Sequence, residues 1–403
     1  MWYKVGLVVA TDRTDITDSF VNFLWGIKMK VSKILGLIFI LGGIFSFSQA
    51  PASAIASSQK LVAAGDNVES DTLPTISRNA FFYFLRGNER YGRGDKRGAI
   101  ENFNQALKLK PDFAEVYYNR GLARAELGDK KGAVEDFNEA LLINPDYAAA
   151  YNNRGNARRE SGDAKGAIAD YNKALQLNPS DAETYNNRGR ARYSLGEMQA
   201  AVSDYNQALQ LNPKLAEVYL NRANARVDLQ DMKGAMSDYN QALQLNPKDY
   251  QAYYNRGLTR RELGDMQGAI ADYTQALSVN PNYVDAYNNR GTTHLQMGNK
   301  PAAIADFNQA LQRNPNLAEA YYNRGTARAD MGNKKGAIQD YSRALQINPS
   351  LAQAYGNRGV AHFQLGDKNN GTADLEKAAQ MFKQQGLPEF SQRALEIIKK
   401  FDN

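Results

Sequence analysis

The 403-residue chain has no cysteine and only two histidines. The lack of cysteine excludes disulfides, thiolate nucleophiles and cysteine-ligated metals. The histidines, His294 and His362, occupy the same position in two units of a repeat, and no cluster of acids surrounds them. A Walker loop is missing, and the glycines between Gly92 and Gly98 lack nucleotide-binding spacing. The sequence therefore predicts that the protein is not an enzyme and that it holds no cofactor and no metal.

A strong excess of one charge is also missing. Lys and Arg number 49, Asp and Glu number 43, and the formal net charge is +6. Because both signs alternate along the chain, no basic stripe forms, and nucleic acid is not expected as a partner.

Long apolar runs are absent too. The run from Ile34 to Phe45 is shorter than the roughly 20 residues that a membrane-spanning helix needs. Basic residues precede it, and Ala52-Ser53-Ala54 follows. This order is typical of a secretory signal peptide. We therefore expect residues 29–54 to be a signal peptide.

Several expectations follow from this signal. Met29 is the expected true start, which makes residues 1–28 a mis-annotated extension. The protein is expected in a periplasm or a thylakoid-lumen-like compartment. An uncleaved membrane anchor is the alternative, and this segment would then be the only membrane contact. Residues 55–79 are polar with little periodicity and are predicted to be a linker.

What the chain has is a 34-residue repeat that runs without insertion through residues 80–385. So rigid a period indicates stacked supersecondary units and not one central core. Nine units fit this range, and residues 386–403 are predicted to form a capping helix. A proline near the end of the unit marks the period: Pro111, Pro145, Pro179, Pro213, Pro247, Pro281, Pro315 and Pro349.

Each unit reads as a helix hairpin. In the unit at residues 114–147, apolar and small residues recur at helical spacing in both halves. Gly128-Asp129 predicts a helix stop followed by an N-cap. Asn144-Pro145 predicts the second stop, because proline cannot continue the helix.

Small residues predict a close approach of the two helices. Gly121 lies on the first helix, and Ala133 and Ala140 lie on the second, with Tyr117 and Phe137 as flanking aromatics. The tyrosine stripe that contains Tyr117 is expected to belong to the core.

The positions Tyr117, Gly121, Ala133, Phe137, Ala140 and Pro145, which recur in most units, resemble the tetratricopeptide repeat, in a variety common in bacterial, notably cyanobacterial, proteins. The resemblance covers residues 80–385. It implies an all-α, right-handed superhelical solenoid of nine helix-turn-helix repeats. It also implies a scaffold that binds a protein or peptide in a concave groove lined by the first helices.

An arginine precedes the glycine position in all nine units, and in eight of them an aspartate follows sixteen residues later. The register places these two residues on facing helices, so an internal Arg–Asp ladder is predicted. A row of exposed arginines that binds anions is the alternative.

The resemblance also indicates the groove residues. Asparagine recurs in eight units at the position of Asn119, where it can pair with a peptide backbone or satisfy neighbouring helix ends or turns. The third and fourth units are the richest in polar groups, and their two arginines could bind a carboxylate. The predicted peptide-binding residues are Asn119, Asn152, Asn153, Asn156, Arg159, Asn186, Asn187, Arg190, Tyr193, Asn221, Tyr254, Asn255, Tyr322 and Asn323.

The expected function is a non-catalytic scaffold that holds a protein or peptide segment, for example during assembly of a complex in the cell envelope. The alternative is a structural spacer in which solenoids associate end to end into homo-oligomers.

Overall fold

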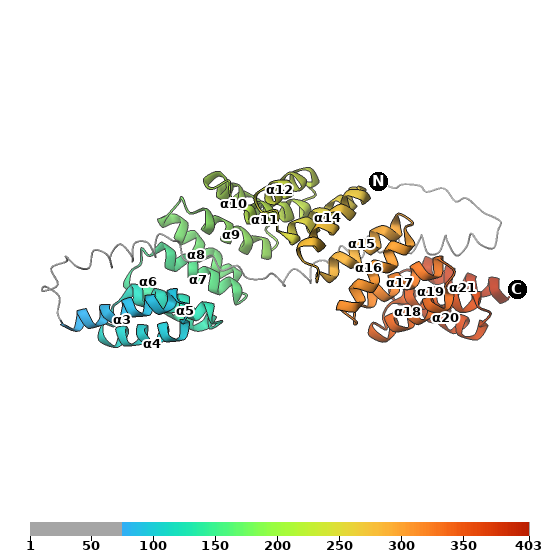
Figure 1. Cartoon of the computed structure of the whole chain (residues 1–403), viewed down its shortest axis with the longest axis horizontal. Helices are drawn as coiled ribbons and strands as arrows, with labels where there is room; N and C mark the ends of the chain where they lie inside the picture. The colour runs from blue at the N-terminus through green and yellow to red at the C-terminus, as the bar shows by residue number, and fades with distance from the viewer. Residues whose placement is uncertain (1–74, 403) are drawn as a thin grey trace. The chain divides into compact units, whose positions relative to one another are not determined.

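The computed structural model describes residues 75–402. The predicted extension, the signal peptide and most of the linker lie outside the described residues. The described chain falls into two compact units, one that ends at Pro247 and one that begins at Lys248. Each unit is a row of antiparallel helices (Figure 1).

The described residues form nineteen helices and no strand. Within each unit, every first helix packs on the second helix of its repeat, and that second helix packs on the next first helix. The fold is therefore an all-α repeat solenoid of nine hairpins with a final single helix, as predicted. The helices are α3 Thr75–Gly92, α4 Lys96–Leu109, α5 Ala114–Glu126, α6 Lys130–Ile143, α7 Ala148–Glu160, α8 Ala164–Leu177, α9 Ala182–Ser194, α10 Met198–Leu211, α11 Ala216–Asp228, α12 Met232–Leu245, α13 Tyr250–Glu262, α14 Met266–Val279, α15 Val284–Gln296, α16 Lys300–Arg313, α17 Ala318–Asp330, α18 Lys334–Ile347, α19 Ala352–Gln364, α20 Lys368–Gln384 and α21 Pro388–Asp402.

Helix α3 begins at Thr75, before the predicted repeat boundary at Ala80. The last residues assigned to the linker are therefore helical. Thr75 directly follows Pro74 in the sequence, and the residue after a proline is free to start a helix, whereas a proline further inside would break it. None of the helices between residues 75 and 402 combines the length and apolar character that crossing a bilayer requires.

The predicted turn between the two helices of a repeat is confirmed. Gly128 has φ +87°, the left-handed conformation of a helix C-terminus. The side chain of Asp129 accepts a hydrogen bond from the backbone N–H of Gly132 at 2.9 Å and so caps α6. That helix ends at Ile143, before Asn144 and Pro145.

One turn departs from this pattern, because Gln230 holds the left-handed position in the fifth repeat, with φ +63°. A side chain with a Cβ is strained in this conformation, whereas glycine is not. Gln230→Gly is therefore expected to raise the free energy of unfolding by about 0.5–1 kcal/mol. Urea denaturation followed by circular dichroism would measure the change, and a loss of stability would contradict the strain argument.

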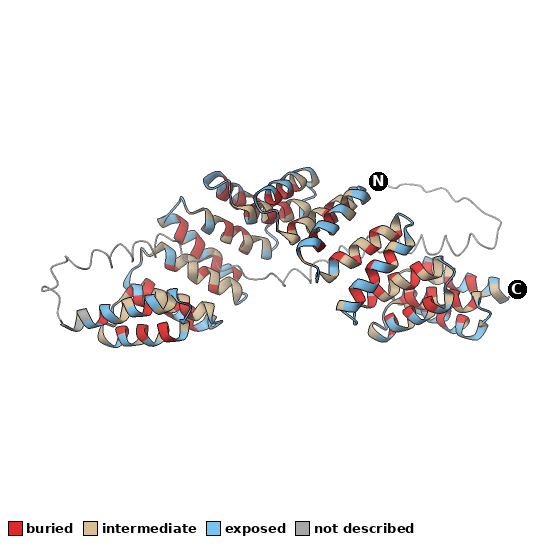
Figure 2. Ribbon diagram, in the orientation of Figure 1, coloured by how far each residue is buried: buried red, intermediate tan, exposed pale blue. Residues whose placement is uncertain are grey.

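The core of each repeat lies between its two helices, where Figure 2 shows the buried faces meeting. Ala133, Phe137 and Ala140 are fully buried. A Cβ placed on Gly121 would lie only 2.8 Å from Cε1 of Phe137, so the ring occupies the space that the glycine leaves. The predicted close approach is confirmed.

The predicted place of the tyrosine stripe is confirmed in part, because its rings pack against the core clusters without being fully buried. Tyr117 is only half-buried, as are its equivalents. The guanidinium of Arg120 lies over the Tyr117 ring at 5.3 Å from its centroid, and the same contact recurs along the chain. The ring therefore packs at the edge of the repeat beneath a charged group, where cation–π attraction favours it.

Candidate peptide-binding surface

The first helices of neighbouring repeats contact one another. In the N-terminal unit these contacts join α3 to α5, α5 to α7, α7 to α9 and α9 to α11, and in the C-terminal unit they join α15, α17 and α19. In the described residues, no pair of second helices makes comparable contacts. Because the first helices approach more closely, they lie on the inner side of the curve within each unit. We call this side the inner face.

The repeated asparagines of the inner face bond to the preceding repeat. The Nδ2 group of Asn153 donates to the hydroxyl of Tyr118 at 2.9 Å. Asn187 donates in the same way to Oδ1 of Asn152 at 3.2 Å, and Asn221 donates to Asn186 at 3.1 Å. These bonds link successive first helices, so the asparagines support the array itself. The partners are first-helix side chains and not the helix ends or turns that the structural interpretation named, and pairing of these asparagines with a peptide backbone stays a prediction.

The other predicted asparagines behave similarly. Asn119 donates to Oδ1 of Asn88 at 2.8 Å. Asn323, which is 2% exposed, donates to the Thr292 hydroxyl at 3.3 Å. Asn156 accepts a hydrogen bond from the Tyr171 hydroxyl at 2.8 Å. Asn255 lies half-buried on α13.

The predicted tyrosine anchors are engaged inside their own unit. Tyr254 accepts a hydrogen bond from Asn289 at 2.9 Å and packs on the rings of Tyr273 and Tyr283. Tyr322 accepts a bond from Asn357 at 3.2 Å. Burial raises the pKa of Tyr322 to about 12, so its hydroxyl stays neutral at physiological pH. These rings stabilise the array more than they offer free contact surface.

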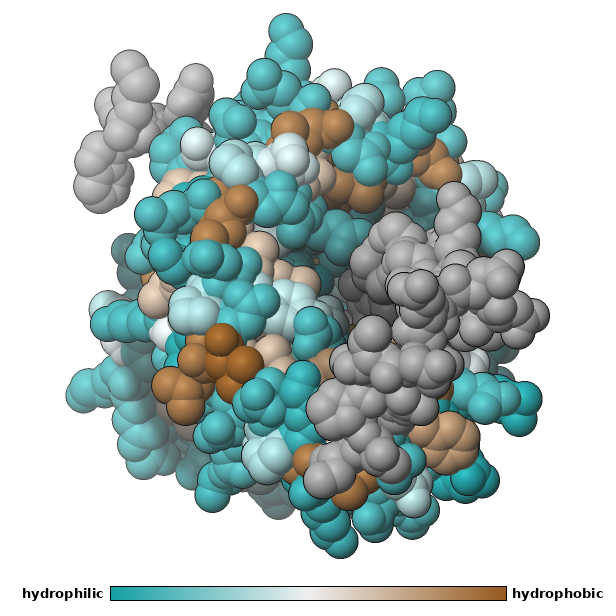
Figure 3. All heavy atoms as spheres, turned by 90° about the vertical axis from the view of Figure 1, so that its left-hand side faces the viewer, coloured by the Kyte–Doolittle hydropathy of each residue, from teal (hydrophilic) through white to brown (hydrophobic). Residues whose placement is uncertain are grey.

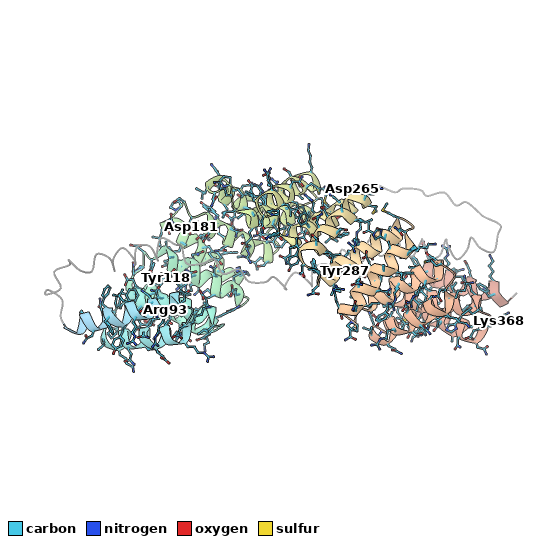
Figure 4. The ribbon with its side chains drawn as sticks, viewed as in Figure 1. Arg93, Tyr118, Asp181, Asp265, Tyr287 and Lys368 are labelled. Carbon is cyan, nitrogen blue, oxygen red and sulfur yellow. The ribbon has the colours of Figure 1, made fainter. Side chains whose placement is uncertain are left out.

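Tyr118, labelled in Figure 4, accepts a hydrogen bond from an asparagine of the next repeat in the same way, within the N-terminal unit. Burial raises its pKa to about 12, against the opposing hydrogen bond from Asn153. Its ring lies 4.7 Å from that of Tyr147, centroid to centroid. The pair of rings fixes the start of the third repeat against the second.

The third and fourth repeats carry two arginines, Arg159 and Arg190, whose guanidinium groups have only weak or exposed partners. Arg190, whose side chain is 37% exposed, pairs with the exposed carboxylate of Glu217 at 3.0 Å. Arg159 lies 3.8 Å from Glu160, and its Nε is buried without a hydrogen-bond partner in the described structure. Tyr193 donates a 2.6 Å hydrogen bond to Asp228. Both arginines therefore have weak or exposed partners that a stronger anion could replace.

Arg159 and Arg190 act on the same neighbourhood. Burial raises the pKa of Tyr171 to about 12, and the charges of both arginines oppose this rise. The same two charges act on Tyr205, whose pKa burial also raises. The charges of two guanidinium groups from successive first helices therefore act on the same pair of tyrosines.

Two partners of this region escaped the sequence analysis. Lys130, at the start of α6, lies 3.0 Å from Glu160, and Glu217 begins the fifth repeat. Both contacts join residues of different repeats, 30 and 27 positions apart. The contacts of this region therefore involve three cations and three carboxylates, which are Lys130, Arg159, Arg190, Glu160, Glu217 and Asp228.

The predicted Arg–Asp ladder is confirmed in all eight repeats that have the pair. Asp238, for example, is 2% exposed and receives Nη2 of Arg222 at 2.6 Å. In most repeats a second arginine also reaches the aspartate, as Arg226 does at 2.7 Å. The Nη1 group of Arg222 donates to Asn206 in the preceding repeat at 2.7 Å. The arginines thus link the two helices of a repeat and also link one repeat to the next. The alternative, a row of exposed arginines that binds anions, was wrong.

His294 replaces the second arginine in the seventh repeat. Its Nε2 lies 4.0 Å from Asp306, and burial lowers its pKa. The ring is therefore neutral at pH 7 and does not form the ion pair that the second arginine forms with the aspartate in other repeats. His294→Arg is expected to raise the free energy of unfolding by about 0.5–1 kcal/mol at pH 7. His362→Arg is the matched comparison, with a smaller gain, because His362 already bonds Asp367 at 3.0 Å. Thermal melts of both variants would measure the difference, and equal gains would contradict it.

Residues 75–402 contain no group of three or more acidic or histidine side chains that could hold a metal.

Comparison with family models gives consistent matches along the chain. A model described as TPR repeat matches residues 87–128, 155–196, 189–230, 223–264 and 257–298. Two models described as tetratricopeptide repeat match residues 114–147, 284–317 and 318–351, and residues 352–385. Together these matches cover more than half of the chain. A comparison with curated proteins gave no match.

Solved structures of repeat proteins are also similar. The structure of YrrB, described as a TPR protein with an unusual peptide-binding site, is 26% identical, with a TM-score of 0.42, and the match covers 46% of this chain and 95% of that one. MamA is 27% identical with a TM-score of 0.39, over 41% and 96% of the two chains. A tetratricopeptide repeat protein from Parabacteroides merdae is 22% identical with a TM-score of 0.46, over 62% and 98%.

Proposed function

The chain belongs to the tetratricopeptide repeat family, and we propose that the inner face of its third and fourth repeats holds a peptide segment that carries a carboxylate. Proteins of this family are in general non-catalytic scaffolds for protein interactions, and this chain is such a scaffold. The single observation that carries the finer proposal is that both arginines are weakly partnered: Arg190 pairs with the exposed Glu217, and Arg159 has a buried Nε without a hydrogen-bond partner in the described structure.

The chemistry of this region favours an acidic ligand. The Arg190–Glu217 pair is exposed on both sides, and exposed pairs contribute little, so a ligand carboxylate can take the place of Glu217 at small cost. A guanidinium binds a carboxylate with two parallel hydrogen bonds, which also fixes its orientation.

The asparagines contribute to this proposal as supports. The bond from Asn187 to Asn152 holds α9 against α7, which are the helices that carry Arg190 and Arg159, and the bond from Asn153 to Tyr118 holds α7 against α5. A peptide that runs along the inner face would cross both arginines one repeat apart.

We also propose that the scaffold works in the cell envelope. The signal-peptide pattern at residues 29–54 supports this placement. A role in assembling an envelope complex would follow from a scaffold of this length in that compartment.

Affinity capture from a cell-envelope extract tests the proposed site. The baits are the unchanged chain, an Arg159→Gln and Arg190→Gln double variant, and an Arg97→Gln variant that loses one exposed charge on α4. The glutamines remove charge without removing the asparagine bonds, so the array stays intact. We expect the unchanged and Arg97→Gln baits to retain one protein that the double variant loses. Equal capture by all three baits would contradict the site.

A further inference from the structure

The N-terminal end of the array exposes an apolar position that is buried elsewhere. Phe82 on α3 is 56% exposed, and its neighbour Phe81 is 43% exposed. In the seven repeats that follow another repeat of their own unit, the residue at the Phe82 position is at most 1% exposed: Val116, Ala150, Thr184, Val218, Ala286, Ala320 and Ala354. We call the exposed surface around Phe82 the N-terminal end face.

A second helix of the preceding repeat covers this position inside the array. Val116 belongs to one apolar cluster with Ala99, Phe103 and Ala106 of α4. Val218 lies in the same way against Ala201 and other residues of α10. The array itself thus shows which element fits this surface: an amphipathic helix with small apolar residues on the contacting side. Figure 3 looks from the side on which α3 and α4 lie, and its hydrophobic patches lie in a mostly hydrophilic surface.

The N-terminal end face also carries an uncompensated cation. Arg86 corresponds to the ladder arginines, but Asn102 stands where the other repeats have aspartate. Asn102 donates its hydrogen bond to the carbonyl of Gly98 at 2.7 Å and brings no charge. Arg86 is exposed, and no described residue pairs with it.

Within each unit, the ladder arginine meets a side-chain oxygen of the preceding second helix. Arg120 donates to Asn104 and Arg222 to Asn206, both at 2.7 Å. These two arginines are already neutralised by their own aspartates. Arg86 has no such acid, so the group that meets it from a docked helix should be a carboxylate and not an amide.

We propose that the N-terminal end face docks an acidic amphipathic helix of a partner protein, which takes the place of a preceding second helix. A second copy fits less well. The outer side of α21 exposes Lys399 and Lys400 together with Glu389, Glu396 and Leu395, so an end-to-end contact would bring further cations to the face that carries Arg86. A symmetric contact of two N-terminal end faces would place two uncompensated Arg86 side chains in one interface.

The probe is a labelled peptide with the sequence of α10, residues 198–211, in which Asn206 is replaced by aspartate. In the array, the unchanged helix covers Val218 and accepts a hydrogen bond from Arg222 through Asn206. It contains no lysine or arginine. The control peptide carries lysine at the position of Asn206. Fluorescence anisotropy with the full chain would measure binding.

We expect the aspartate peptide to bind at least fivefold more tightly than the lysine peptide. Phe82→Ser should weaken binding at least fivefold, and Arg86→Gln should remove the difference between the aspartate peptide and the unchanged asparagine sequence. Leu127→Ser, which changes an exposed leucine away from this end, should have no effect. Circular dichroism would check that every variant is folded.

Three results would overturn the proposal. One is that neither peptide binds at millimolar concentration, which is also the result expected if another part of the chain already covers the N-terminal end face. Another is binding that neither Phe82→Ser nor Arg86→Gln weakens. The third is a dimer of the full chain in analytical ultracentrifugation that Phe82→Ser dissociates, because the occupant would then be a second copy.

Discussion

Asp238→Ala is expected to lower the free energy of unfolding by about 3–5 kcal/mol, because it removes the buried carboxylate that two arginines share. Asp238 is 2% exposed. It accepts hydrogen bonds from Nε and Nη2 of Arg222, at 2.9 and 2.6 Å, and from Nη1 of Arg226 at 2.7 Å. Without it, two half-buried guanidinium groups keep their charge and lose their shared partner.

Glu139→Ala is the matched control. Glu139 is an exposed acid on α6, three residues after the equivalent aspartate of the second repeat. Its loss should change the unfolding free energy by no more than about 0.5 kcal/mol. Because repeat arrays unfold locally, urea denaturation should be paired with hydrogen exchange in α11 and α12. Equal effects of the two substitutions would contradict the buried ladder.

Phe137→Ala is expected to cost about 3–5 kcal/mol, through lost apolar contact and the cavity left behind. Phe137 is fully buried, and its ring fills the space opposite Gly121. It also lies 5.9 Å from the ring of Tyr118, centroid to centroid. The cavity would therefore open between the two helices of the second repeat and beneath the inner face.

Leu142→Ala controls for this substitution, because Leu142 lies on the same helix with 77% of its surface exposed. We expect a change of at most about 0.5 kcal/mol. Phe137→Leu should be intermediate, since leucine stands at this position, as Leu375, in the ninth repeat and is fully buried there. Urea denaturation of the three variants measures their free energies of unfolding and so gives the order of their stabilities. An alanine variant as stable as the parent would mean that the ring is not a core element.

The fold was predictable from the sequence because each repeat is specified locally. Gly128, Asp129 and Pro145 set the helix ends by turn chemistry that depends on neighbouring residues alone. The spacing of Arg222 and Asp238 placed the ladder correctly, because it depends only on the packing of one hairpin.

The candidate site was predicted less well, because its contacts depend on how one repeat lies on the next. The bond from Asn153 to Tyr118 spans 35 positions, and that from Arg190 to Glu217 spans 27. Neither offset equals the repeat length, so the period of the sequence could not reveal the pairing. For the same reason, the engagement of Tyr254 by Asn289 was missed.

The central claim is that a partner lies on the inner face of the third and fourth repeats. Because the chain contains no cysteine, a single introduced cysteine can carry a photo-crosslinker at one defined place. Ala149→Cys puts it on α7, at the exposed position equivalent to that of Glu217, and Glu139→Cys puts it on the exposed side of a second helix. After irradiation in envelope extract, we predict that the Ala149→Cys chain crosslinks one protein, through an acidic segment that mass spectrometry identifies. Crosslinking of the same protein from Glu139→Cys alone, or equally from both positions, would contradict the account.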